Sequence, residues 1–317
     1  MKLDLRARVR EFVIWPFLDR FWLQRLHNKR YRSENVYVIF SEARGGSTWL
    51  MEMLNQRLNA FICWEPLHPR RGIIKVEPEV PALSHKDVVD AHAEKKISSI
   101  FSGAAINAWT VSKNNSPLFK SNRNYDRLLI KFVRGNRILK DLGSFVSLQN
   151  KPILLLRHPA ATLFSQKKRF RVHMLDYFNK GYLNEDPEFL KHKDFFSSLK
   201  TDLQKEFFLY CFNNRVVLRQ WDSLDCIPLF YEELIVNAEQ ELDDVFDQWN
   251  ISRKIGPIQS RKTSSEGSRE GNVVDPEMQL KKWSSKVSDE KKIQMQKVFN
   301  YFDIRVYNMQ ALGPQKP

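Results

Sequence analysis

Two short segments of this chain carry the residue types that bind phosphate groups. The first runs from Arg44 to Trp49 and the second from Arg157 to Ser165. Each segment follows a short apolar run and comes where a helix is predicted to begin. The start of a helix leaves backbone N–H groups unpaired and carries partial positive charge, so an anion placed there finds hydrogen-bond donors. The two segments are therefore candidates for the two ends of one nucleotide site.

The first segment combines backbone freedom with hydrogen-bond donors. Gly45 and Gly46 let the backbone approach an anion closely and adopt positive φ angles. Ser47 and Thr48 can cap the helix or donate a hydroxyl group, and Arg44 supplies a fixed cation. A glycine turn ahead of an ordinary helix has the same appearance, so this segment alone leaves both interpretations open.

In the second segment, Arg157 directly follows an apolar run that is predicted to be a buried strand. Open α/β sheets bind their ligands at the carboxyl ends of such strands. Pro159 suits the first turn of a helix, and Ser165 comes about two helical turns later, so one group lying along the helix can contact both Arg157 and Ser165. The alternative is that Arg157 pairs with a surface carboxylate and Ser165 is an ordinary helical serine. The presence of both segments in one chain favours the nucleotide site.

Apolar runs that alternate with helical patterns predict the fold. The runs are residues 36–40, 61–64, 128–133, 153–156 and 227–231. Continuous apolar runs are typical of strands buried on both faces, and helices are expected over residues 47–58 and 87–102. This alternation predicts an α/β fold with a P-loop-like parallel sheet flanked by helices on both faces. A chain of 317 residues, 42% of them apolar, fits a single such domain, expected over residues 34–317.

The segments that carry these features resemble those of a known enzyme family. Ser41–Trp49 (SEARGGSTW) resembles the 5′-phosphosulfate loop of sulfotransferases that use 3′-phosphoadenosine 5′-phosphosulfate (PAPS). Leu156–Ser165 resembles the family's 3′-phosphate motif, which has an Arg and a Ser at this spacing. Phe61–Leu67 resembles a segment of the carbohydrate sulfotransferases, and Phe230–Leu234 resembles a strand end of the family. The run 283–302 resembles the closing helix of such enzymes.

The resemblance implies a reaction and a donor site. The reaction is in-line transfer of a sulfuryl group from PAPS, which leaves as adenosine 3′,5′-bisphosphate (PAP), to a hydroxyl or amine of a carbohydrate or glycolipid acceptor. The donor-binding residues it implies are Arg44, Gly45, Gly46, Ser47, Thr48, Trp49, Arg157, Ser165 and Tyr231. For Tyr231, burial for packing is an equal alternative to a place near the adenine. Sulfotransferases of this family need no metal, and the chain has neither HExxH nor paired Cys/His, so no metal is expected.

The resemblance also implies three catalytic residues. Arg44 and Lys131 occupy the positions of cations that stabilise charge on the leaving group. The cytosolic branch of the family carries a catalytic His two residues beyond that Lys, where this chain has Val133. Glu65 instead matches the acidic residue that carbohydrate sulfotransferases present to the acceptor, and we expect it to be the general base.

Alternatives remain open around Glu65. Burial in its apolar run should raise the pKa of the Glu65 carboxyl toward the working pH, while Arg44 should lower it. An ion pair with Arg70 or Arg71 would give Glu65 a purely structural role. His68 is close enough in the sequence to be a rival base.

The charge of the chain indicates anionic partners without choosing among them. Lys and Arg number 51 against 37 Asp and Glu, a formal net charge of +14, which suits a nucleotide, an acidic glycan, nucleic acid or an anionic membrane. A nucleic-acid-binding protein is one alternative function, but the chain shows no recognised nucleic-acid motif, and we expect no such partner. A P-loop kinase or NTPase is another, but the loop lacks the Gly-Lys-Ser/Thr ending.

The cysteines and the N-terminal segment bear on location. Three cysteines without a CxxC pair argue against a disulfide framework and for a reducing, cytoplasmic compartment. No stretch approaches the ~20 apolar residues of a membrane span. Residues 1–33 form a basic, amphipathic arm. Either residues 1–32 contact an anionic membrane surface, or this arm is a terminal helix packed on the domain.

Overall fold

The computed structural model describes most of the predicted domain. The described residues are 29–68, 71–74, 91–114, 125–170, 175, 183, 186–252 and 275–316, without the side chains of 91–93 and 167–170. Residues 1–28, which make up most of the basic N-terminal arm, lie outside the described residues. The arm's membrane contact therefore stays a prediction.

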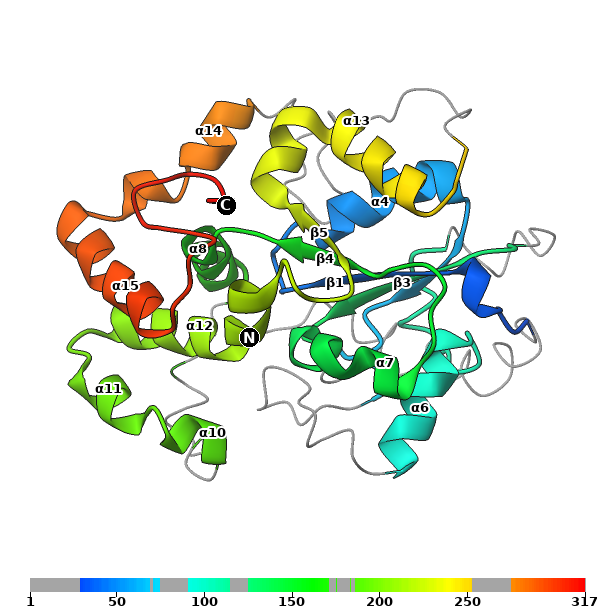
Figure 1. Cartoon of the computed structure of the whole chain (residues 1–317), viewed down its shortest axis with the longest axis horizontal. Coiled ribbons are helices and arrows are strands. Elements are labelled where there is room, and N and C mark those ends of the chain that lie inside the picture. Colours follow the sequence, from blue (N-terminus) through cyan, green and yellow to red (C-terminus); the bar gives the residue numbers. More distant parts are fainter. Residues whose placement is uncertain are drawn as a thin grey trace, which may run out of the picture.

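The centre of the structure is a parallel sheet of five strands in the order β2-β3-β1-β4-β5 (Figure 1). The strands are β1 (Val36–Ser41), β2 (Phe61–Trp64), β3 (Leu128–Val133), β4 (Ile153–Leu156) and β5 (Ile227–Phe230). The five predicted strands are confirmed, with one correction at the last. Tyr231 does not end β5 but begins the helix that follows it. Since every neighbouring pair is parallel, all carboxyl ends meet at one edge of the sheet, where the predicted site residues lie.

Helices connect the strands and cover both faces of the sheet, which confirms the predicted fold class. The α-helices are α4 (Ser47–Leu58), α6 (Ala91–Phe101), α7 (Leu142–Phe145), α8 (Pro159–Phe170), α10 (Pro187–Leu190), α11 (Lys193–Ser198), α12 (Asp202–Gln220), α13 (Tyr231–Gln248), α14 (Pro276–Lys281) and α15 (Asp289–Tyr301). Short 3₁₀ turns are η2 (Ser33–Asn35), η3 (Asn136–Asp141) and η4 (Ser284–Lys286). The expected closing helix over 283–302 is therefore a 3₁₀ turn followed by α15 from Asp289.

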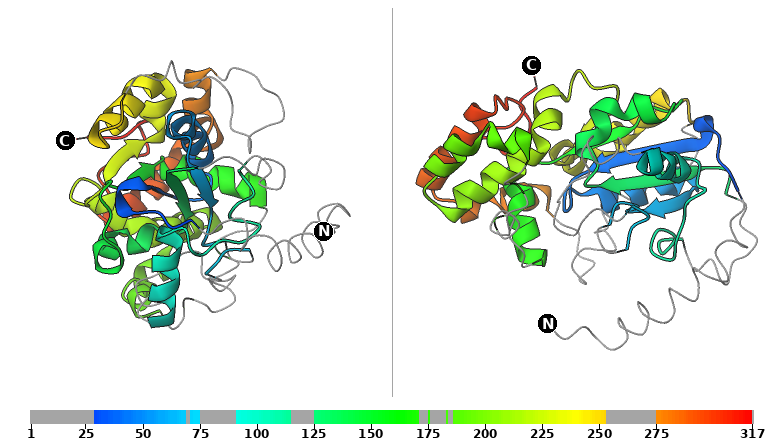
Figure 2. Two further views of the ribbon diagram at one scale, coloured as in Figure 1. Left: turned by 90° about the vertical axis from the view of Figure 1, so that its right-hand side faces the viewer. Right: turned by 90° about the horizontal axis from the view of Figure 1, so that it is seen from below.

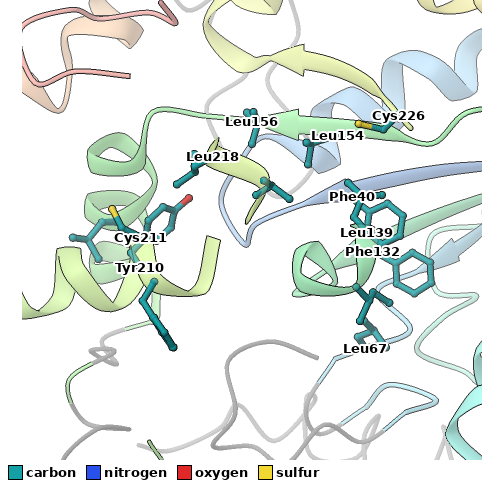
Figure 3. Close-up of a cluster of buried hydrophobic side chains, with 14 of the residues drawn as sticks. Phe40, Leu67, Phe132, Leu139, Leu154, Leu156, Tyr210, Cys211, Leu218 and Cys226 are labelled. Carbon is teal, nitrogen blue, oxygen red and sulfur yellow. The ribbon is translucent and has the colours of Figure 1, made fainter. Parts of the chain in front are cut away.

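Alternate side chains of the strands enter two separate cores. Ile39, Leu129 and Leu155 pack with α4 and α13 on one face, which lies uppermost in Figure 1. Phe40, Phe132 and Leu154 point to the opposite face, which η3, α7 and α12 help to cover (Figures 1 and 3). Burial of the strands on both faces explains why their sequences are continuous apolar runs rather than alternating ones. Lys131 is the exception, because it is a buried cation in the middle of such a run.

A second layer of helices lies beyond the carboxyl ends of the strands. There α12 packs against both α8 and α15, and the C-terminal segment returns from α15 toward β5 (Figures 1 and 2). A capping box between Thr201 and Gln204 starts α12. The three cysteines are buried and unbridged. Within the described part of the chain, no helix has the length and apolar content to cross a membrane.

Candidate active site

The two predicted phosphate-binding segments lie side by side. β1 and β4 are neighbours in the sheet, so the loop after β1 faces the start of α8. The Nε of Arg44 lies 3.3 Å from the Ser165 hydroxyl, and a guanidinium N–H of Arg157 donates to the carbonyl of Arg44 at 2.8 Å. The guanidinium of Arg157 thus points toward the 44–49 loop. One ligand could contact both segments.

Both glycines of the loop are required by its geometry. Gly46 caps α4 with φ of 99°, and a Cβ there would lie 2.6 Å from the Cε2 of the Tyr231 ring. A Cβ on Gly45 would overlap the Ser41 hydroxyl and approach the carbonyl of Glu42 to 2.9 Å. Neighbours leave no room for a Cβ at either position, and the positive φ expected of both glycines is found at Gly46 and not at Gly45. The loop is therefore tightly wound, with the first amides of α4 directly behind it.

Tyr231 contacts residues of both segments. The Arg157 guanidinium lies over its ring at 4.2 Å from the centroid, and Trp49 meets the ring edge-on at 6.0 Å. The Tyr231 hydroxyl accepts a hydrogen bond from Gln279 of α14 at 3.2 Å. The Nε of Arg157 is buried and has no hydrogen-bond partner. Arg157 therefore keeps one hydrogen-bond donor that no group of the described residues uses.

Lys131 and Glu65 form a buried ion pair beside the loop. The register of the sheet places Lys131 opposite Trp64, one residue before Glu65. The Lys131 ammonium lies 2.8 Å from a Glu65 carboxylate oxygen, 3.2 Å from the Thr48 hydroxyl and 3.5 Å from the centroid of the Trp64 ring. Lys131 is only 1% exposed. This cation therefore connects the predicted base with the first turn of α4.

The two opposing effects expected on the pKa of Glu65 are present, but the cation that lowers it differs from the expected one. Burial does raise the pKa of this carboxyl, but the charge and hydrogen bond of Lys131 outweigh it, helped by Arg134 and His68, and the pKa lies below its usual value. Lys131 rather than Arg44 is the opposing cation. The carboxylate is thus ionised at neutral pH.

The alternatives for Glu65 can be placed in the same way. Its partner in the described residues is Lys131, while the Arg71 guanidinium lies over the Trp109 ring at 5.0 Å and Arg70 lies outside the described residues. His68 also packs against the Trp109 ring, with centroids 4.6 Å apart. The Trp109 indole N–H donates to the Glu65 carbonyl at 3.3 Å. His68 therefore stays within the same cluster and remains a rival base.

Sequence reasoning missed Arg134 at this edge. It follows β3 directly, as Arg157 follows β4, and its φ of 74° is unusual for a residue other than glycine. One of its guanidinium nitrogens is buried without a hydrogen-bond partner, and its charge lowers the pKa of Glu65. The signal that could have found it is its place after an apolar run, the same signal that singled out Arg157.

Glu42, at the end of β1, was also missed. Burial raises the pKa of its carboxyl to about 7, against the opposing effect of Arg134, the Ala43 backbone and Arg137. Glu42 lines a small cavity together with Gly45 of the loop. Other polar residues that line this cavity are Asn136, Arg157, Thr162, Tyr210 and Asn214. The loop is therefore backed by a polar interior and not by a dry core.

Solved structures show only a weak similarity to this chain. A scan against models of protein families finds no match, and a search of curated proteins finds none either. Among solved structures, the sulfotransferase domain of the olefin synthase from Synechococcus PCC 7002 is 16% identical, with a TM-score of 0.39 over 87% of this chain and 96% of that one. The sulfotransferase domain from the curacin biosynthetic pathway is 17% identical, with a TM-score of 0.42 over 85% and 97% of the two chains. Likeness of this degree does not define chemistry, which rests on the residues above.

The described part of the chain offers anion-binding groups rather than metal ligands. Arg44, Arg134 and Arg157 follow the carboxyl ends of β1, β3 and β4, and Lys131 lies within β3, two residues before its end. Among the described residues, no three His, Cys, Asp or Glu side chains gather in a group that could hold a metal ion. The arrangement can bind an anion with more than one phosphate or sulfate group and can present one ionised carboxylate to a second ligand.

Proposed function

We propose that this protein is a sulfotransferase that moves a sulfuryl group from PAPS to a hydroxyl or amine of a carbohydrate or glycolipid. The observation that carries the proposal is the contact between the two segments, Arg44 with Ser165 and Arg157 with the Arg44 carbonyl. The sequence resemblance assigns these segments to opposite phosphates of one nucleotide. Their proximity is what a single bisphosphorylated ligand requires.

In this proposal, the donor is held by charge and by backbone amides. The 5′-phosphosulfate lies on the amides of residues 45–48, with Arg44 beside it, and the 3′-phosphate lies on Arg157 and Ser165. The unpartnered Nε of Arg157 fits this use, because a buried donor without a partner gains most from an anion. Tyr231 and Trp49 supply aromatic surface for the adenosine.

Glu65 and Lys131 divide the chemical step between them. The ionised Glu65 carboxylate accepts the proton of the acceptor hydroxyl while that oxygen attacks sulfur and the bridging oxygen of PAP leaves. Lys131 and Arg44 stabilise the negative charge that spreads onto the leaving group. Lys131 is suited to this because its ammonium already contacts both Glu65 and Thr48 of α4. A carboxylate paired with Lys131 is a weaker base than a free one, so loss of this contact during the reaction would strengthen it.

The acceptor class rests on fewer observations. The carbohydrate or glycolipid assignment comes from the resemblance of Phe61–Leu67 to a segment of the carbohydrate sulfotransferases. This segment contains β2 and, directly after it, the proposed base Glu65. Trp109 is partly exposed and its indole N–H donates to the Glu65 carbonyl, so an aromatic side chain lies next to the base, with Arg71 and His68 packed against its ring. Sites that bind sugars use aromatic side chains for packing while the sugar hydroxyls make hydrogen bonds.

The proposal is tested by calorimetry with three ligands: PAP, ATP and duplex DNA. We expect PAP to bind, ATP to bind at least tenfold more weakly, and duplex DNA not to bind. Arg157→Ala should weaken PAP binding, whereas Arg305→Ala, at an exposed arginine paired with Asp303, should leave it unchanged. Preference for ATP would favour a kinase or NTPase, and tight DNA binding would favour a nucleic-acid-binding protein. Transfer of radiolabelled sulfate onto glycans, glycolipids and phenols then identifies the acceptor class.

A further inference from the structure

The residue after Arg157 is enclosed by the C-terminal part of the chain. His158 is fully buried, and its ring stacks on Trp283 with centroids 4.2 Å apart and planes inclined by 17°. Tyr307 meets the same ring edge-on at 5.1 Å, and Phe299 does so at 6.1 Å. Three aromatic side chains from beyond α14 therefore fix the imidazole.

Hydrogen bonds set the orientation and tautomer of His158. Its Nε2 lies 3.0 Å from the Asn308 carbonyl, which can only accept, so Nε2 carries the hydrogen. Its Nδ1 accepts from the Ala160 backbone N–H at 3.2 Å. The pKa of His158 is lowered to about 4, and burial is the main cause. The charge of Arg157 adds to this effect, and the hydrogen bond with the Asn308 carbonyl opposes it. The ring is therefore neutral at physiological pH and satisfies both contacts in one tautomer.

Glu232 links this histidine to the other side of the site. The His158 backbone N–H donates to one Glu232 oxygen at 2.9 Å, and the Tyr307 hydroxyl donates to the other at 3.1 Å. Glu232 is 5% exposed and follows Tyr231 directly. The 157–158 and 231–232 pairs are thus joined twice, through the Arg157 guanidinium on the Tyr231 ring and through this carboxyl.

Further contacts hold the C-terminal segment 303–316 over these pairs. The backbone N–H of Met309 donates to the Gln296 side chain at 2.9 Å, and Gln315 donates to the Val306 carbonyl at 2.8 Å. The Lys316 ammonium lies 2.7 Å from a Glu233 oxygen, one residue beyond Glu232. The segment therefore returns to the start of α13, where the proposed nucleotide site begins.

We propose that Tyr307 and His158 are positioning residues that act through Glu232 to hold Arg157 and Tyr231 in the geometry that binds the donor. This inference rests on the proposed function for the identity of the ligand. In the structure, Tyr307 contacts Glu232 and His158, which directly follow Tyr231 and Arg157 in the chain. Loss of its hydroxyl leaves one oxygen of a buried carboxyl without its donor, and that oxygen then competes for other hydrogen bonds at the junction.

The test uses Tyr307→Phe with Tyr301→Phe as its matched control. Both changes remove a hydrogen-bonded tyrosine hydroxyl from the C-terminal layer, since Tyr301 contacts His192 at 2.9 Å away from the site. We expect Tyr307→Phe to weaken PAP binding by about threefold to tenfold and Tyr301→Phe to leave it unchanged. In an Arg157→Ala background, Tyr307→Phe should weaken PAP binding by less than it does in the wild-type background, because only its effect through Tyr231 remains. Equal, additive losses in both backgrounds would overturn the positioning role.

A measurement without ligand keeps this inference separate from the proposed function. In a crystal structure of Tyr307→Phe, the Arg157 guanidinium should move off the Tyr231 ring or away from the Arg44 carbonyl, and in Tyr301→Phe it should stay. An unchanged Arg157 in Tyr307→Phe would contradict the inference even if the wild-type protein binds PAP. Failure of the wild-type protein to bind PAP would contradict the proposed function, while a displaced Arg157 would still support the coupling.

Discussion

At the scale of single residues, the pair of Lys131 and Glu65 is the part of the site that substitutions can test most directly. Two charges removed from water are costly to bury unless they meet in good geometry. Here the 2.8 Å contact is supplemented by the Thr48 hydroxyl and the Trp64 ring. A cation and a carboxylate buried together at the edge of a parallel sheet are typical of a functional site, although structural ion pairs also exist.

Replacement of Glu65 by Gln should abolish turnover and leave the affinity for the nucleotide unchanged. The amide keeps the shape of the side chain but cannot accept a proton, so kcat should fall about a hundredfold or more. The dissociation constant for PAP, measured by calorimetry, should stay within about twofold, because the proposed donor contacts do not include Glu65. His68→Ala is the companion variant. Full activity of Glu65→Gln combined with inactivity of His68→Ala would make His68 the base.

Glu42 gives a prediction about pH. Its pKa is about 7 in the folded protein against an ordinary value of 4.5, so between these values the folded protein holds a proton that the unfolded chain releases. The contribution of Glu42 to stability is therefore full below about pH 4.5 and is lost as the pH rises through about 7. Glu42→Gln should remove this dependence. In urea unfolding from pH 5 to 8, the stability of Glu42→Gln relative to wild type should rise with pH, whereas a constant difference would contradict the assignment.

At the scale of elements, the strand-to-helix turn before α4 depends on Gly46. Its positive φ and the Tyr231 ring beside it leave no room for a side chain. Such turns store strain or exclude side chains where function requires a close approach. The same ring carries the Arg157 guanidinium, so a disturbance at Gly46 would be transmitted to the second segment.

Gly46→Ala should therefore destabilise the fold and weaken PAP binding together. The strained φ alone costs about 1–3 kcal/mol, and displacement of Tyr231 adds to the loss of affinity. Urea unfolding and calorimetry measure the two effects. Gly143→Ala in α7 is the control, because a Cβ there meets nothing within 4 Å, and its stability should be equal to or slightly above that of wild type. Unchanged PAP affinity in Gly46→Ala would show that the loop does not bind the nucleotide.

The elements that sequence reasoning found are those with strong local signals. Continuous apolar runs identified all five strands, and the Gly-Gly turn and Pro159 marked the starts of α4 and α8. Nothing was predicted for α12, whose residues 206–214 are buried without interruption and so form no stripe at helical spacing. The predicted start of the last helix at Trp283 is wrong because residues 284–286 form a 3₁₀ turn, Val287 is extended, and α15 begins at Asp289 after the N-cap Ser288.

The site was predictable in its composition but not in its pairings. Arg44, Arg157 and Ser165 could be named from type and spacing, and Lys131 from the family resemblance. The partner of Glu65 could not be named, because it depends on the register that sets Trp64 opposite Lys131. Register is decided by packing across the whole sheet and not by the local sequence of either strand. The net direction of the pKa shift of Glu65 follows from that pairing and was left open for the same reason.

At the scale of the whole molecule, the proposed site contains some of the cations behind the net charge of +14. Cations from the loop after β1, from β3 and from the ends of β3 and β4 converge on one edge of the sheet, and the helical layer of α8, α12 and α15 lies beside that edge (Figure 2). Convergent charge raises the local concentration of an anionic ligand and its rate of association. The C-terminal segment then completes the structure around the same edge through Tyr307 and Glu232.

The strand order has a consequence for the folding of the chain during its synthesis on the ribosome. β1 pairs with β3 and β4, so Ile39 finds its partner Ile153 only after that residue has left the ribosome. Parallel pairs close long loops before any contact rewards them, which makes such sheets slow to form. A growing chain therefore carries its glycine loop without the arginine that completes it until the 107 residues between Trp49 and Arg157 have been made, and its ability to capture a nucleotide should not appear before then.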